Sequence, residues 1–265
     1  MTTTAASVRV SLDAATRAGL DALLLSMADD EFVIGFSDSE WTGIAPMLEE
    51  DVAMSSLALD EIGHARALYE LLAELRGDGN DADSIAFDRQ PAGYRHCRLV
   101  DGGRGDWAMT IARRYLYDTA DAARLEAVAQ SSWAPLAELV AKLRREEKYH
   151  VMHVSTWLER LALGGDEART RLLAAFAKLA PDAATVFAPL PGESVLVAGG
   201  VLATPLSEAE ARWRASITPD MVRLKMPMPP PAVAPERGRL DHSDDFRWLW
   251  TEFTTVRRLD PEATW

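Results

Sequence analysis

Two short motifs of the same kind combine a potential metal-binding acid with a histidine. Both read Glu-x-x-His, at Glu61–His64 and at Glu147–His150. On an α-helix, residues three positions apart lie on one face, so each motif can direct a carboxylate and an imidazole at a common point. One such motif alone is weak evidence for a site, and its repetition is what makes it informative.

Each motif is preceded by a single acid at nearly the same distance. Glu31 lies 30 positions before Glu61, and Asp118 lies 29 positions before Glu147. Two Glu-x-x-His helices, with one acid from each of two partner helices, form the ligand set of a carboxylate-bridged two-metal centre in a four-helix bundle. The sequence therefore predicts a site for two metal ions, iron or alternatively manganese, with redox chemistry on oxygen as the leading function. The predicted ligands are Glu31, Glu61, His64, Asp118, Glu147 and His150.

Two further acids stand directly before the ligand glutamates. Asp60 and Glu146 are predicted to accept the second N–H of a metal-bound histidine, each from the opposite helical hairpin. The alternative is that the acids and histidines of both motifs form ion pairs on solvated helix faces, which the charged sequence around Glu146 also allows. Apolar residues on both sides of Glu61 and of Asp118 favour a buried site.

The remaining histidines and the lone cysteine receive lesser roles. His153 lies about one helical turn beyond His150 and is placed on an outer face or interface. His96 and Cys97 fall in a connecting segment, where a thiolate is a poor ligand for a carboxylate-rich site, and His242 falls in the C-terminal part. Aromatic residues near the predicted ligands are interpreted as core residues rather than redox relays. They are Trp41, Tyr115, Tyr117, Tyr149 and Trp157.

The elements that must position these residues are helical through the N-terminal two thirds of the chain, because apolar residues recur there at helical spacing. The predicted helices cover about 12–36, 47–75, 106–130, 134–163 and 167–187. The segment 77–105 is rich in glycine, aspartate and proline, and it predicts a long crossover between two hairpins, 12–75 and 106–163. This organisation predicts an all-α fold, a ferritin-like four-helix bundle with extra C-terminal helices and an irregular tail.

The C-terminal part has less regular patterning. The short apolar run Ser194–Val201 is interpreted as an extended segment. Ser207-Glu-Ala-Glu210 resembles a capping box that opens a short helix reaching about Ile217. A proline-rich linker at Met226–Pro231 leads to a last predicted helix over about His242–Val256.

Length and composition indicate a single domain over 1–265, with the bundle at about 12–163 and an additional helix and tail over 164–265. The net charge of −13 leaves no basic surplus for nucleic-acid binding. A single cysteine fits a reducing compartment, and neither a signal peptide nor a membrane-spanning apolar run is recognised. We therefore expect a cytoplasmic protein that binds neither nucleic acid nor membranes.

Several stretches of the sequence resemble one known family. They are Trp41-Thr-Gly-Ile-Ala-Pro-Met-Leu-Glu-Glu-Asp51, Leu57-Ala-Leu-Asp-Glu-Ile-Gly-His-Ala-Arg66, Tyr149-His150 and Trp157-Leu-Glu-Arg160. From about Leu23 to Trp265 the chain is similar to the subunits of phenylacetate-CoA oxygenase, the ring 1,2-phenylacetyl-CoA epoxidase of aerobic phenylacetate catabolism. The resemblance is closest to the C subunit.

The resemblance implies a role in a multicomponent monooxygenase. In this family a catalytic A subunit carries the di-iron centre, and the C subunit pairs with it as a structural partner. A small B subunit and a flavin/iron–sulfur reductase, which delivers electrons from NADPH, complete the system. The catalytic ligand pattern matches all six predicted ligands of this chain, whereas familiar C subunits replace the residues at the positions of His64 and Glu147.

Three functions are therefore open from the sequence. Chain-wide resemblance favours a C-type subunit of a phenylacetyl-CoA epoxidase, pairing with an A subunit and keeping a di-iron site. The six ligand positions favour a chain that is itself a di-iron oxygenase acting on an aromatic acyl-CoA. A ferritin-like ferroxidase or metal-storage protein is the third, although the long tail argues against a storage cage. A homodimer is the alternative assembly in the absence of partners.

Overall fold

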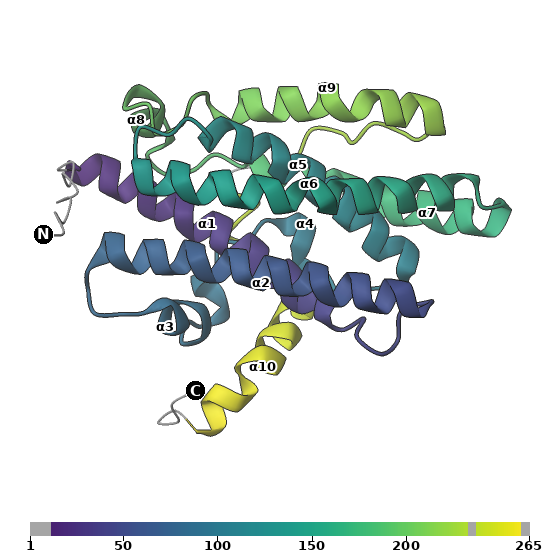
Figure 1. Ribbon diagram of the computed structural model, residues 1–265, viewed down its shortest axis with the longest axis horizontal. Helices are drawn as coiled ribbons and strands as arrows, with labels where there is room; N and C mark the ends of the chain where they lie inside the picture. Colours follow the sequence, from purple (N-terminus) through teal and green to yellow (C-terminus); the bar gives the residue numbers. More distant parts are fainter. Residues whose placement is uncertain (1–11, 233–236, 261–265) are drawn as a thin grey trace, which may run out of the picture.

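The computed structural model describes residues 12–232 and 237–260, and every secondary-structure element in these ranges is a helix. Four long helices run beside one another (Figure 1): α1 (Ala14–Ser39), α2 (Leu48–Arg76), α5 (Trp107–Val128) and α6 (Ala134–Leu163). The shorter helices are α3 (Ala82–Phe87), η1 (Pro91–Gly93), α4 (Arg98–Asp101), α7 (Asp166–Leu179), η2 (Ala180–Phe187), α8 (Glu193–Ala198), α9 (Leu206–Leu224) and α10 (Asp244–Leu259). The all-α prediction is confirmed for these residues. Of the predicted domain over 1–265, residues 1–11, 233–236 and 261–265 lie outside the described ranges.

Local sequence signals explain where the long helices begin and end. The side chain of Asp13 accepts a hydrogen bond from the Thr16 N–H at 2.7 Å and caps α1. Asp106 caps α5 in the same way by accepting from the Met109 N–H at 2.9 Å. Gly77 ends α2 with a φ of 61°, a left-handed conformation that glycine adopts without steric cost.

Helices α1 and α2 approach each other closely at Gly35, beside the predicted ligand Glu61. The two helices form one hairpin, and α5 and α6 form the other. At Gly35 of α1, an added Cβ would lie 2.9 Å from Ile62 Cγ1 and 3.1 Å from Glu61 Cβ. The absence of a side chain at Gly35 therefore lets α2 lie against α1 beside Glu61, about one turn from Glu31.

Three consecutive buried acids in the middle of α1 organise its surroundings. Successive helical side chains point about 100° apart, so Asp29, Asp30 and Glu31 face different neighbours. Asp29 accepts hydrogen bonds from Arg89 of the crossover, at 2.9 and 2.5 Å. Asp30 accepts from Arg239 of the C-terminal part, at 2.9 Å for each oxygen. The acidic run thus holds the crossover and the tail while it presents Glu31 to the bundle interior.

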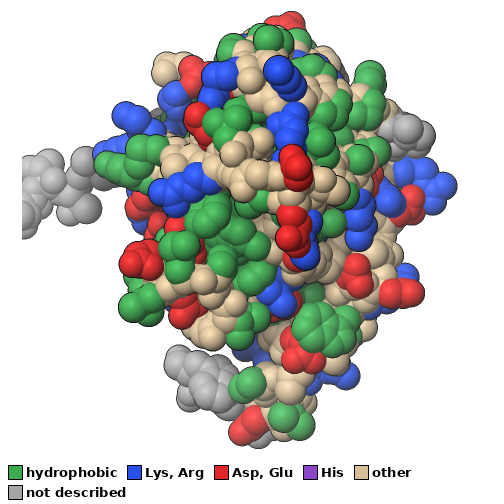
Figure 2. Space-filling model, turned by 90° about the vertical axis from the view of Figure 1, so that its right-hand side faces the viewer, with side chains coloured by type: hydrophobic (Ala, Val, Ile, Leu, Met, Phe, Trp, Pro, Cys, Tyr) green, Lys and Arg blue, Asp and Glu red, His purple; other side chains and the backbone are tan. Residues whose placement is uncertain are grey.

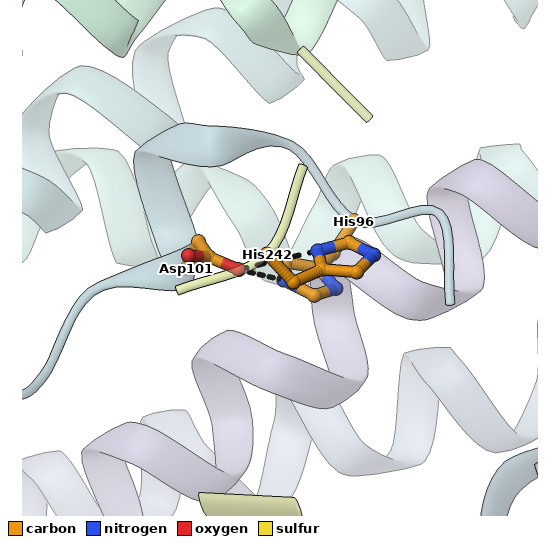
Figure 3. Close-up of side chains that lie close together, drawn as sticks. All are labelled: His96, Asp101 and His242. Carbon is orange, nitrogen blue, oxygen red and sulfur yellow. Dashed lines mark hydrogen bonds and ion pairs between the residues drawn. The ribbon is translucent and has the colours of Figure 1, made fainter. Parts of the chain in front are cut away.

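A second polar cluster fastens the C-terminal part to the crossover (Figure 3). His96 Nε2 and His242 Nδ1 lie 2.7 and 3.2 Å from the same oxygen of Asp101, and the Ser243 N–H donates to the other oxygen at 2.6 Å. His242 Nε2 also lies 3.0 Å from the Tyr94 carbonyl. Two imidazoles and a carboxylate could hold a metal. Here both Asp101 oxygens and both His242 nitrogens have protein partners, which indicates a structural link that holds the start of α10 in place.

Replacing Asp101 by asparagine is expected to loosen α10 and to lower the free energy of unfolding by about 1–3 kcal/mol, because the bound imidazoles and N–H group lose a charged acceptor. Although burial opposes ionisation, hydrogen bonds from His242 and His96 hold the pKa of Asp101 well below its usual value. Hydrogen exchange over 244–259 measures the loosening. The control is Asp244→Asn in the exposed first turn of the same helix, and equal exchange in both variants would contradict the role of the cluster.

Two predictions for the C-terminal part were wrong. Ser194–Val201 is not extended, because α8 covers Glu193–Ala198. The capping box at Ser207–Glu210 does not form, because α9 already begins at Leu206 and has no side-chain cap. Instead, the Glu193 carboxylate accepts the Leu206 N–H at 2.9 Å, so a residue of α8 satisfies the first N–H of α9.

Other boundaries shifted for identifiable reasons. The fifth helix, expected over 167–187, ends as an α-helix at Leu179 and continues as the 3₁₀ helix η2, with Pro181 in its first turn. Helix α9 runs seven residues past Ile217, to Leu224. None of the helices in the described part of the chain has the length and apolar character needed to span a lipid bilayer.

Candidate metal centre

The six predicted ligands come from four helices and are buried in the interior, where ligand atoms of Glu31, Glu61, His64 and Glu147 lie within 4.8 Å of one another. Each is at most 3 % exposed. Helix α1 provides Glu31 and α5 provides Asp118, while α2 and α6 each provide a Glu-x-x-His pair. The alternative that these residues form ion pairs on solvated helix faces is therefore wrong for the six ligand positions. The acids and histidines lie at Glu31, Glu61, His64, Asp118, Glu147 and His150.

Both histidines present Nδ1 to the carboxylates. His64 Nδ1 lies 3.3 Å from Glu147 Oε1, 3.5 Å from Glu31 Oε2 and 3.6 Å from Glu61 Oε2. His150 Nδ1 lies 3.1 Å from Glu147 Oε1 and 3.4 Å from Glu61 Oε1. The two rings are 6.0 Å apart between centroids. Nitrogen and oxygen ligand atoms thus face one another at the separations found around a bound cation.

The outward nitrogens contact acids of the opposite hairpin. His64 Nε2 lies 2.8 Å from Glu146 Oε2, and His150 Nε2 lies 3.3 Å from Asp60 Oδ2. Both acids are part-exposed, so solvent reaches the outer edge of each pair. In a neutral imidazole, a carboxylate that accepts Nε2–H leaves the lone pair on the inward Nδ1, which is the tautomer that binds a metal.

The inner atoms of the centre have no hydrogen-bond partners. Buried atoms that lack one include Oε2 of Glu31 and of Glu61, both oxygens of Asp118 and of Glu147, and Nδ1 of both histidines. Buried polar groups are normally satisfied by hydrogen bonds, so this group of unpaired atoms calls for an explanation. The unpaired atoms of Glu31, Glu61, His64 and Glu147 lie close enough together to fit a bound metal ion.

Two neighbouring residues contact the centre. The sequence did not single out Arg114, and it predicted Tyr117 as a core residue near the ligands. Arg114, one helical turn before Asp118, is fully buried and donates a hydrogen bond to Glu61 Oε1, and its Nε lies 3.3 Å from Asp118 Oδ1. Tyr117 donates a hydrogen bond of 2.7 Å to Glu31 Oε1. The spacing of Arg114 and Asp118, which places both on one helix face, was the signal that could have found the arginine.

Shifted pKa values reduce the repulsion between the buried acids in the absence of a metal. Burial, reinforced by the charge of Glu61, raises the pKa of Glu31, and burial raises the pKa of Asp118. Burial opposes charging of His150, but the adjacent carboxylates of Glu147 and Glu61 raise its pKa to about 11. The metal-free centre thus retains protons, which a metal would have to displace.

Comparison with known proteins places the chain in a family. Residues 4–265 match the family model described as phenylacetic acid catabolic protein. The chain belongs to the phenylacetic acid catabolic protein family. It is also 30 % identical over 247 residues to the C subunit of the 1,2-phenylacetyl-CoA epoxidase of Escherichia coli (strain K12), a match that covers 93 % of this chain and 99 % of that protein. The family resemblance predicted from the sequence motifs is confirmed.

Other residues of this family member that were considered from the sequence lie outside the centre. His153 Nε2 is 3.2 Å from Glu50 Oε2, so it joins α6 to α2 away from the ligand set. Cys97 has a buried free thiol, and its backbone N–H donates a hydrogen bond to Asp30. Tyr149 is 65 % exposed, so its interpretation as a core residue was wrong. The other four aromatic residues are buried.

Proposed function

We propose that the chain is the C-type subunit of a multicomponent phenylacetyl-CoA 1,2-epoxidase, that it pairs with a homologous catalytic A subunit, and that its buried centre binds iron. A small B subunit and an NADPH-dependent flavin/iron–sulfur reductase would complete the system in the cytoplasm. The observation that carries the assignment is the similarity to a C subunit over 93 % of this chain and 99 % of the relative.

An exposed apolar surface supports the pairing. On α2, Leu48, Val52 and Leu59 are 74, 61 and 70 % exposed, and on α6 Tyr149 and Met152 are 65 and 60 % exposed. Helices α2 and α6 contact each other, so these side chains belong to neighbouring helices. Figure 2 shows the end of the molecule where α2 begins, with apolar side chains at the surface between charged ones. Such surfaces commonly mark protein interfaces, here with the A-type subunit.

Co-expression with the A-type subunit of the same organism tests the pairing. A stable heteromeric complex is expected, and Leu59→Lys should weaken it about tenfold or more, because a charge would replace an apolar contact. Val222→Lys is the matched control, since Val222 is equally exposed, at 72 %, on α9. Failure of the two chains to associate, or equal weakening by both variants, would refute the pairing on this surface.

The buried centre supports the metal part of the proposal. Glu31, Glu61, His64 and Glu147 would hold the ion, and Glu146 would orient His64 by accepting its Nε2–H. Iron bound among carboxylates and imidazole supplies redox chemistry with oxygen. The surrounding helices exclude water from the ligand atoms, which strengthens the electrostatic attraction for a cation.

A second candidate function is favoured by the complete set of ligand positions. In this alternative the chain is itself a di-iron oxygenase acting on an aromatic acyl-CoA. Glu61→Ala or His150→Ala should then abolish both metal binding and turnover by the reconstituted system. Unchanged turnover in either variant would leave the chain with a non-catalytic role. A ferritin-like ferroxidase is the weakest alternative, because the long C-terminal part after Pro189 argues against packing into a hollow cage.

A further inference from the structure

The centre offers two positions for a cation, one beside each histidine. Glu61 Oε2 lies 3.6 Å from His64 Nδ1, and Glu61 Oε1 lies 3.4 Å from His150 Nδ1. Glu147 Oε1 lies within 3.3 Å of both Nδ1 atoms. Glu61 therefore turns one oxygen to each half of the site. We name the halves the His64 position and the His150 position.

The His64 position has a complete set of ligands. Glu31, Glu61, His64 and Glu147 each offer one ligand atom, and all four atoms lie within 4.8 Å of one another. Oε2 of Glu31, Oε2 of Glu61 and His64 Nδ1 have no hydrogen-bond donor. Three carboxylates and one imidazole, with Glu146 behind the imidazole, are an adequate donor set for Fe²⁺ or Mn²⁺.

The His150 position is different because a guanidinium lies against its ligands. Arg114 Nη1 donates to Glu61 Oε1, which is the oxygen that faces His150. Arg114 Nε lies 3.3 Å from Asp118 Oδ1, and Nη1 lies 3.5 Å from Asp38 Oδ2. Arginine stays charged in proteins, so this cation cannot be removed by losing a proton.

We infer that Arg114 is a built-in cation at the His150 position and that the centre therefore binds a single metal ion, at the His64 position. A second ion would need Glu61 Oε1 at about 2.0–2.2 Å, where Arg114 already donates, and it would lie beside a fixed positive charge. This inference rests on the proposed metal binding and differs from the two ions expected from the sequence.

The number of bound ions tests the inference. The purified full chain, loaded with Mn²⁺ and desalted, is expected to hold about one ion, and Arg114→Met about two, because the variant frees Glu61 and Asp118. Electron paramagnetic resonance adds a second readout, since an isolated Mn²⁺ shows no spin coupling and a carboxylate-bridged pair does. Arg113→Met is the matched control, because Arg113 is also buried on α5 but donates to the Gly103 carbonyl. It should hold one ion.

A second pair of variants decides the question if Arg114→Met does not fold. Asp118→Asn should keep the single ion, since Asp118 faces Arg114 and not the His64 position. Glu31→Gln should lose it, since Glu31 belongs to that position. Two coupled ions in the wild type, or loss of the ion in Asp118→Asn, would overturn the inference and leave the proposed metal binding intact. No bound ion in the wild type would refute both.

Discussion

Replacement of Asp30 by asparagine is expected to destabilise the protein by about 3–5 kcal/mol, the cost of removing one partner from a buried charge network. Asp30 is fully buried, and both of its oxygens accept hydrogen bonds from Arg239. Arg124 of α5 and the N–H of Cys97 donate to it as well. Loss of the carboxylate charge leaves two buried guanidinium groups under-compensated and releases α1 from the crossover, α5 and the C-terminal part. Chemical unfolding measures the change.

A matched variant on the same helix isolates the effect of burial. Asp21 of α1 also pairs with an arginine, Arg76, at 2.5 Å, but both side chains are about a quarter to a third exposed. Asp21→Asn is expected to cost about 0–1 kcal/mol, as is usual for an ion pair in contact with water. If Asp30→Asn costs no more than Asp21→Asn, the buried network does not hold the elements together.

The pH dependence of Asp30→Asn follows from the direction of its pKa shift. Burial opposes ionisation, but the charges of Arg239 and Arg124 outweigh it and lower the pKa of Asp30 below 3.8. The stabilisation by this carboxylate is therefore fully present above the unfolded-state pKa and is lost as the pH falls through the folded-state pKa. The difference in unfolding free energy between wild type and variant should be constant near neutral pH and should shrink below about pH 4.

The long helices could be predicted from the sequence because their signals are local. Apolar spacing, the cap at Asp106 and the left-handed Gly77 fix α1, α2, α5 and α6 to within a few residues. The short segment Ser194–Val201 could not be assigned, because an apolar run of this length suits a strand or a helix equally. Its helical state depends on tertiary contacts, among them Leu196 packed against Gly19 of α1. The ferritin-like arrangement of the bundle stays a prediction.

The polar residues of the metal centre and its surroundings could also be predicted only in part. The six ligand positions could be found because Glu-x-x-His is a local pattern that repeats, whereas their role as ligands is still a prediction. The charge partners of α1 could not be found, because Asp30 binds residues 94 and 209 positions away. The cluster of His96, Asp101 and His242 was missed for the same reason, since it joins residues 141 positions apart. Sequence spacing carries information within a helix but little about which distant polar groups meet.

Replacement of Glu147 by glutamine is expected to abolish metal binding by the purified chain. Glu147 Oε1 lies 3.3 Å from His64 Nδ1 and 3.1 Å from His150 Nδ1, and both of its oxygens lack a hydrogen-bond donor. No other carboxylate oxygen of the six ligand residues has this place between the two imidazoles. A neutral amide of nearly the same shape removes the charge and offers N–H donors to a cation. Metal analysis and the metal-dependent rise in melting temperature measure the loss.

The neighbouring residue provides the sharpest comparison. Glu146→Gln makes the same chemical change one position earlier, but Glu146 contacts the outward Nε2 of His64 and is part-exposed. It is expected to weaken metal binding roughly 10–100-fold without abolishing it, as for residues that orient a ligand. Retention of metal by Glu147→Gln would exclude this centre as the binding site.

The stability of the metal-free Glu147→Gln protein separates loss of a ligand from loss of the fold. Burial and the charge of Glu61 oppose ionisation of Glu147, but the two histidines outweigh them and lower its pKa. The carboxylate therefore stabilises the metal-free protein at neutral pH, and the variant should fold with a somewhat lower free energy of unfolding than the wild type. The larger change should appear when metal is added, because the variant then also lacks a charged ligand. Complete unfolding of the metal-free variant would mean that Glu147 holds the bundle together without any metal.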